Sequence, residues 1–205
     1  FGLSVPGDPS TASFFVAAAA LVPNSEIVMN RVLANPTRTG FFNALEKMGA
    51  RMEYLKQWNE GGEKVGNLKI FHKPLNPISI EEADIPGLVD EIPILAILAT
   101  QANGKTKISG AGELRVKECD RIRAICENLQ KMGSGIMEKK DGFVIEGPEQ
   151  LIGTHIKTYN DHRIAMAFTI AGLISDGLVT LDNPECVRIS FPEFFTYVQK
   201  FEKNK

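Results

Sequence analysis

Between residues 115 and 123 the chain carries four cationic side chains, namely Arg115, Lys117, Arg121 and Arg123. We expect a helix over residues 117–133, and in such a helix Lys117 and Arg121 would lie on one face, because they are four residues apart. Like charges at this spacing slightly destabilise a helix. The pair therefore indicates either a bound anion or an ordinary solvated basic face, and the spacing alone leaves both open.

Two acidic residues have surroundings that suit proton transfer. Glu118 heads the apolar stripe Ile122, Ile125 and Leu129, so we expect it on the buried face at the start of the same helix. Apolar neighbours and the positive helix end act on a carboxyl in opposite directions, and this balance suits a residue that gives and takes a proton. The alternative is a capping acid in the first turn.

Asp90 stands three residues before Pro93, a residue that a helix tolerates in its first turn. Asp90 therefore lies at or just before a helix N-terminus, where it is either functional or a plain N-cap worth about 1 kcal/mol. His162 and Arg163 follow Asp161 in the first turn of another expected helix. A cation there opposes the helix dipole, which favours a bound anion as compensation.

These residues belong to a pattern that occurs three times: an aspartate, a nearly all-apolar helical run, a polar turn and a short strand. The apolar runs are residues 12–22, 92–102 and 164–174. Asp8, which precedes Pro9, and Asp161 suit the N-cap position of their helices. The turn residues Asn24, Gly104 and Gly177 follow their aspartates by 16, 14 and 16 positions. Such self-similarity predicts a repeated supersecondary unit, and helices that are apolar on every side are buried.

Further elements complete the rhythm of strand, helix, strand, helix, strand, strand. We expect amphipathic helices at 39–49 and 117–133, each ending at a glycine, Gly49 or Gly133. Strand pairs are expected at 51–55 with 68–72 and at 136–139 with 143–146, and a last helix at 193–201. The predicted architecture is an α/β (α+β) fold with three buried helices and the sheets outside, in one domain over residues 1–205.

Composition limits the possible functions. The chain has 205 residues, of which 43% are hydrophobic and 23% charged, and a net charge of −2, so nothing favours nucleic acid or anionic membranes as partners. Its longest apolar runs fall short of the roughly 20 residues that span a bilayer, and no segment resembles a signal peptide. The start at Phe1 is interpreted as a fragment boundary. The three cysteines and three histidines have no metal-ligand spacing, so we expect reduced thiols, a cytoplasmic protein and no metal site.

Several stretches, taken together and in this order, resemble the C-terminal half of the 5-enolpyruvylshikimate-3-phosphate synthase family. They are VPGDPSTASFFVAAAAL (5–21), DEIPILAILATQANG (90–104), ELRVKECDRI (113–122), NDHRIAMAF (160–168) and SFPEFF (190–195). The pattern looks closer to the family's bacterial glyphosate-insensitive class than to its plant-like class.

The resemblance implies a transferase of aromatic amino-acid biosynthesis that moves the enolpyruvyl (carboxyvinyl) group of phosphoenolpyruvate to the 5-hydroxyl of shikimate 3-phosphate and releases phosphate. It implies addition followed by elimination, with no metal or other cofactor. It also implies a monomeric enzyme of two similar domains, each an inside-out α/β barrel of three βαβαββ units, with the active site between them. The N-terminal domain is absent from this chain, so we expect the isolated chain to be inactive.

By the same resemblance, Asp90 corresponds to the carboxylate that holds and deprotonates the attacking hydroxyl. Glu118 corresponds to the acid that protonates the methylene carbon and later takes a proton back. Among the cations, Arg121 and Arg163 correspond to the pair that clamps phosphoenolpyruvate. The remaining two matches are Lys117, a shikimate-phosphate ligand, and His162, a supporting residue.

Two positions depart from the family pattern. A lysine found in some members corresponds to Ile189, and the neighbouring Arg188 would point to the opposite side of an extended segment. A substrate-binding asparagine of some members corresponds to Glu113. Two alternatives stay open: the related UDP-N-acetylglucosamine enolpyruvyl transferase, which the stretches VKECDR and NDHRIAMAF argue against, and a non-catalytic interaction module built on the same repeat.

Overall fold

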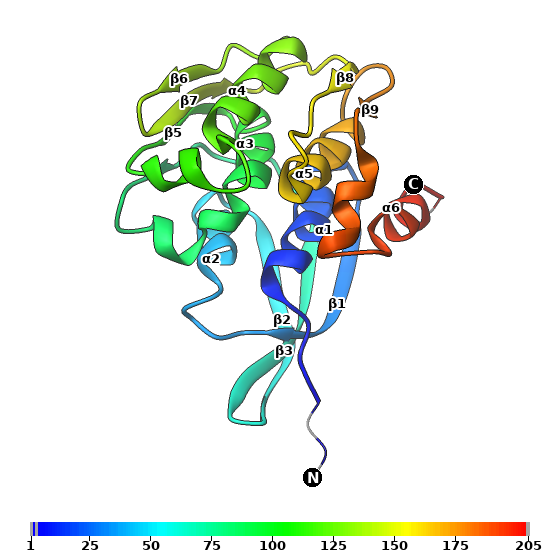
Figure 1. Cartoon of the computed structure of the whole chain (residues 1–205). Coiled ribbons are helices and arrows are strands. Elements are labelled where there is room, and N and C mark those ends of the chain that lie inside the picture. The colour runs from blue at the N-terminus through cyan, green and yellow to red at the C-terminus, as the bar shows by residue number, and fades with distance from the viewer. Residues whose placement is uncertain (1, 3, 204–205) are drawn as a thin grey trace.

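Three buried helices lie side by side at the centre of the computed structural model, which describes residue 2 and residues 4–203 (Figure 1). They are α1 (Pro9–Leu21), α3 (Ile92–Thr100) and α5 (His162–Gly172), and each packs against the other two. All nine residues of α3 are buried, and in α1 every residue is buried except Thr11. The apolar character of these runs thus predicts their position correctly.

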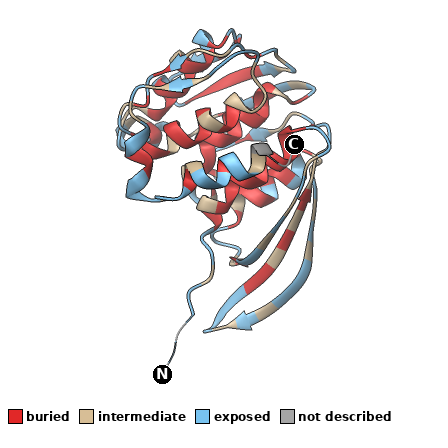
Figure 2. Ribbon diagram, turned by 90° about the vertical axis from the view of Figure 1, so that its right-hand side faces the viewer, coloured by how far each residue is buried: buried red, intermediate tan, exposed pale blue. Residues whose placement is uncertain are grey.

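Strands and the remaining helices surround these three helices (Figures 1 and 2). One sheet has the antiparallel order β1-β3-β2, a second has the order β4-β5-β7-β6, and β8 pairs with β9 in parallel. The strands are β1 (Glu26–Leu33), β2 (Arg51–Glu60), β3 (Glu63–Phe71), β4 (Ser79–Ile80), β5 (Gly104–Ile108), β6 (Met137–Lys139), β7 (Gly142–Gly147), β8 (His155–Ile156) and β9 (Thr180–Leu181). The outer helices are α2 (Gly40–Lys47), α4 (Arg121–Lys131) and α6 (Phe194–Lys203). The chain therefore has the mixed α/β fold that its sequence predicts.

Local signals in the sequence set the ends of these elements. The residues predicted to turn after each buried helix, Asn24, Gly104 and Gly177, all have positive φ, at 61°, 135° and 88°. Gly49 and Gly133, which follow α2 and α4, have φ of 82° and 88°. Left-handed backbone of this kind favours glycine and, less strongly, asparagine, so the predicted turns and helix caps are confirmed.

The helix expected over 117–133 begins four residues later than predicted. Asp120 is its N-cap, because the Asp120 carboxylate accepts a hydrogen bond from the Arg123 N–H at 3.0 Å. Arg115 pairs with the same carboxylate at 2.8 Å and holds the preceding 3₁₀ turn in place. Lys117 therefore lies outside α4, and the prediction that Lys117 and Arg121 share one helical face is wrong.

The segment around Arg188 is not extended. Residues Pro184–Ile189 form a 3₁₀ helix, so Arg188 and Ile189 do not alternate as they would in an extended segment. Arg188 pairs with Glu185, three residues earlier, at 2.9 Å, and Ile189 is exposed. Among the described residues, no helix is long and apolar enough to span a bilayer.

Candidate active site

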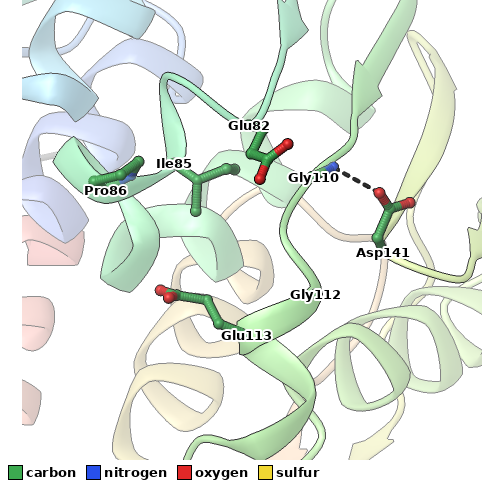
Figure 3. Close-up of a pocket in the computed structure, with 7 residues that line it drawn as sticks. All are labelled: Glu82, Ile85, Pro86, Gly110, Gly112, Glu113 and Asp141. Atoms are coloured by element: carbon green, nitrogen blue, oxygen red, sulfur yellow. Dashed lines mark hydrogen bonds between the residues drawn. The ribbon is translucent and has the colours of Figure 1, made fainter.

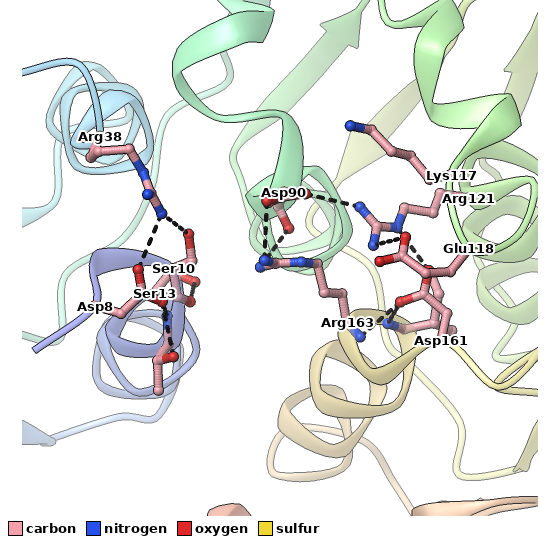
Figure 4. A network of polar contacts seen from close by, with 12 residues as sticks. Asp8, Ser10, Ser13, Arg38, Asp90, Lys117, Glu118, Arg121, Asp161 and Arg163 are labelled. Atoms are coloured by element: carbon pink, nitrogen blue, oxygen red, sulfur yellow. Dashed lines mark hydrogen bonds and ion pairs between the residues drawn. The ribbon is translucent and has the colours of Figure 1, made fainter. Parts of the chain in front are cut away.

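The Arg121 guanidinium is the centre of a cluster at the N-terminal ends of α3, α4 and α5 (Figure 4). Its side chain is fully buried, yet each nitrogen faces a different carboxylate. Nε contacts Asp161 at 2.8 Å, Nη1 contacts Asp90 at 3.1 Å and Nη2 contacts Glu118 at 2.5 Å. Burial lowers the pKa of Arg121, but the hydrogen bond and charge of Asp161 outweigh it and raise that pKa, so the guanidinium stays charged.

The Asp90 carboxylate bridges two arginines from different helices. Oδ1 contacts Arg121 of α4, and Oδ2 contacts Nη2 of Arg163 of α5 at 3.0 Å. Asp90 lies in the 3₁₀ turn Val89–Glu91 just before α3, as predicted. The alternative that it is a plain N-cap is wrong, because α3 begins without a side-chain cap.

Glu118 and Lys117 lie in the bend between the 3₁₀ turn and α4. The Glu118 side chain is 48% exposed, so the prediction of a buried helical face is wrong. Its close neighbour is Arg121 rather than the apolar stripe. Lys117 lies beside Arg121 in Figure 4, and its Nζ is 3.7 Å from the Glu113 carboxylate. The structure thus brings both predicted acids and three predicted cations, Lys117, Arg121 and Arg163, to one place.

Asp161 has a second contact that the sequence analysis missed. As predicted, it caps α5: Oδ1 accepts hydrogen bonds from the backbone N–H groups of Arg163 and Ile164. Its other oxygen, Oδ2, binds Arg121. Cys119 also donates to Oδ2 at 3.6 Å, and burial, then the Asp161 charge, raise the pKa of this thiol to about 12. Asp161 therefore fixes Arg121 as well as the helix.

A spacing in the sequence could have revealed these ion pairs. Asp8 caps α1 and pairs with Arg38 at 3.1 Å, 30 residues later, while Asp90 pairs with Arg121, 31 residues later (Figure 4). In each of the first two units, the aspartate before the buried helix thus pairs with an arginine later in the chain. In the third unit, position 191 is a phenylalanine, and Asp161 uses Arg121 instead.

Comparisons with known proteins test the predicted family. A family model described as EPSP synthase (3-phosphoshikimate 1-carboxyvinyltransferase) matches residues 1–198. The chain belongs to this family. The 3-phosphoshikimate 1-carboxyvinyltransferase of Thermodesulfovibrio yellowstonii is 49% identical to it over 206 residues, which cover 99% of the chain and 47% of that relative.

Solved structures show the same relation to the EPSP synthase family. An EPSP synthase from Acinetobacter baumannii superposes with a TM-score of 0.93 at 37% identity, over 97% of this chain and 46% of that one. An enolpyruvyl transferase from Streptomyces tendae has a TM-score of 0.66 at 19% identity, over 93% and 42%, and so shares the fold. The chain spans about half the length of the curated relatives it matches. The family predicted from the motifs is confirmed.

His162 is the first residue of α5 in this EPSP synthase family member, and it is buried. Burial, followed by the charge of Arg163, lowers the pKa of His162 below its usual value. The imidazole is therefore neutral in the folded chain near pH 7, and Arg163 is the cation that opposes the α5 dipole.

The neutral His162 makes stability depend on pH. As pH falls through about 6.5, the ordinary histidine pKa, the unfolded chain takes up a proton before the folded chain does. The free energy of unfolding should therefore decrease from pH 7.5 to pH 5.5, and less so in His162→Gln. Urea unfolding at both pH values measures this, with exposed His155→Gln as control. An equal decrease in wild type and His162→Gln would contradict the prediction.

A separate pocket on the molecule is unsuited to anions (Figure 3). Its charged lining residues are all acidic, and one of them, Asp141, accepts a hydrogen bond from Gly110 N–H at 3.0 Å. The lining residues are Glu82, Ile85, Pro86, Gly110, Gly112, Glu113 and Asp141. Among the described residues, no group of three or more His, Cys, Asp or Glu is arranged to hold a metal.

Proposed function

We propose that residues 1–205 form the C-terminal domain of a two-domain enolpyruvyl transferase. The whole enzyme transfers the carboxyvinyl group of phosphoenolpyruvate to the 5-hydroxyl of shikimate 3-phosphate and releases phosphate, in aromatic amino-acid biosynthesis. Family membership and the half-length match to relatives support this proposal. The observation that carries it is the cluster in which Asp90 and Glu118 both contact Arg121, with Arg163 beside them.

In this proposal the two arginines bind phosphoenolpyruvate. Guanidinium groups suit its carboxylate and phosphate because they can donate two parallel hydrogen bonds. Both arginines contact Asp90 in the free chain. An arriving anion competes with Asp90 for these donors, and the released carboxylate can then accept the proton of the attacking hydroxyl.

The two acids divide the proton transfers. Asp90 takes the hydroxyl proton as the C–O bond to the acceptor forms, and Glu118 delivers a proton to the methylene carbon. In the elimination, Glu118 takes a proton back from that carbon as phosphate leaves. Lys117 binds the shikimate phosphate. Neutral His162 has a supporting role, because the charges of Arg163 and Glu118 both act on it. No step needs a metal or a cofactor.

The same proposal extends to architecture and context. The chain forms an inside-out α/β barrel of three βαβαββ units, which the three buried helices and three positive-φ turns support. Its partner is its own N-terminal domain, and the full enzyme is a monomer that needs neither nucleic acid nor membrane. The free thiols of Cys119, Cys126 and Cys186 fit a reducing cytoplasm.

Comparing the chain with the full-length protein tests the proposal. Phosphate release from the two substrates should require the full-length protein, because the proposed active site lies between the two domains. The chain alone should release none. Turnover by the chain alone would contradict the division of the site, and a full-length protein without turnover would favour the non-catalytic module.

A further inference from the structure

Glu91 is a buried carboxyl next to the site that the proposed reaction does not use. Its residue is only 5% exposed, and no described residue hydrogen-bonds its Oε1. Within the described chain the other such side-chain oxygen is Oε2 of Glu149, which is far along the sequence after β7. A buried carboxyl oxygen without a donor costs free energy, so its retention beside a reactive cluster points to a function.

Glu91 is influenced by groups at the N-terminal ends of all three buried helices. It follows Asp90 and precedes α3, and its carboxyl interacts with the Ser10 hydroxyl of α1. The charged groups that act on it are Arg163 of α5, neighbouring Asp90, and Asp8 at the start of α1. Burial raises the pKa of Glu91, while Ser10 and Arg163 act to lower it. Arg163 is thus the cation that stabilises the Glu91 carboxylate.

Arg163 needs a carboxylate to hold it when Asp90 moves away, and Glu91 can supply one. Its guanidinium contacts the Asp90 carboxylate and, at 3.5 Å, the Asp90 carbonyl oxygen. If Asp90 must leave Arg163 to take the hydroxyl proton, as the proposed function requires, Arg163 loses the chain's own carboxylate that holds it and keeps only the substrate anion. A mostly buried arginine without a carboxylate would be poorly fixed for binding a substrate anion.

We propose that Glu91 is a positioning residue whose carboxylate holds Arg163 in place when Asp90 engages the acceptor substrate. The inference rests on the proposed function, because that function makes Asp90 move away from Arg163. The oxygen Oε1 is the acceptor that becomes occupied in the substrate complex. In the free protein no described residue donates a hydrogen bond to this oxygen, and Arg163 is bound to Asp90.

The test is Glu91→Gln in the full-length protein, because glutamine keeps the shape and removes the charge. We expect the KM for phosphoenolpyruvate to rise about tenfold, as for loss of one charged contact, with the KM for shikimate 3-phosphate unchanged. Thermal stability should be equal or higher, since a desolvated charge is removed. Activity of the wild type should also fall on the acid side as Glu91 takes up a proton, and this limb should be weaker in Glu91→Gln.

Glu149→Gln is the matched control, because it also removes a carboxylate with one buried unpartnered oxygen, but outside the cluster. Its KM values should equal those of the wild type. If Glu91→Gln fails to fold, Glu91→Asp, which keeps the charge but shortens its reach, should raise the same KM.

Crystal structures of wild type and Glu91→Gln with phosphoenolpyruvate decide the inference independently of turnover. We expect Arg163 within hydrogen-bond distance of Glu91 in the wild-type complex and displaced in the variant. An unchanged KM together with an unmoved Arg163 would overturn the inference while leaving the proposed function intact. A full-length wild type without transferase activity would instead refute the proposed function.

Discussion

Exchange of Arg121 for methionine in the full-length protein should abolish turnover and lower the free energy of unfolding by about 3–5 kcal/mol. The large stability effect follows from Asp161, whose side chain has no exposure and would lose its cationic partner. Asp90 and Glu118 are partly exposed, at 37% and 48%, and water can replace Arg121 there. Urea unfolding and a phosphate-release assay measure the two effects.

Two further variants separate the causes. Arg123→Met, two residues along α4, removes an arginine that is 66% exposed and paired with Glu127, so stability should stay close to that of the wild type. Combining Arg121→Met with Asp161→Asn removes the stranded charge, so much of the lost stability should return while turnover stays absent. Wild-type stability in Arg121→Met alone would show that the buried ion pairs contribute little.

Glu118→Gln should reduce kcat by roughly 10²–10⁴-fold, the usual range for loss of a general acid or base. The amide oxygen can still accept a hydrogen bond from Arg121, but the side chain can no longer give and take a proton. Because Glu118 is half-exposed and lies outside α4, the free energy of unfolding should change by less than about 1 kcal/mol. The combination of lost turnover and kept stability is the signature of a chemical role.

Glu185→Gln is the control for this substitution, since Glu185 is exposed and pairs with an arginine three residues away, as Glu118 does. It should leave both kcat and stability unchanged. An unchanged kcat in Glu118→Gln would remove the role proposed for Glu118 in proton transfer.

Local physical chemistry explains which parts of the fold could be predicted. Asp8 and Asp161 cap their helices as expected, because an N-cap depends on residues within three positions. The start of α4 was misplaced because its N-cap, Asp120, is held by an ion pair with Arg115. Arg115 also pairs with Glu138 on β6, and no local sequence pattern reveals this tertiary contact.

The arrangement of the site could not be predicted without the tertiary structure. Motifs brought Asp90, Glu118, Arg121 and Arg163 forward as candidates, but not the fact that one buried guanidinium joins three segments. Asp161 looked like a cap because its helix explains it fully, and only the fold brings it to Arg121, 40 residues away. Glu91 gave no signal, since an acid beside a helix start is ordinary on a surface and unusual only when buried.

Each cation of the cluster already has a carboxylate within 4 Å: Lys117 has Glu113, Arg121 has Asp161, and Arg163 has Asp90. The carboxylates at this short range, with Glu118 included, outnumber the three cations, so this half offers weak long-range steering to a diffusing anion. Capture by this half should therefore depend little on ionic strength. In the proposed function its arginines act at contact, where they exchange a carboxylate of the chain for an anionic group of the substrate.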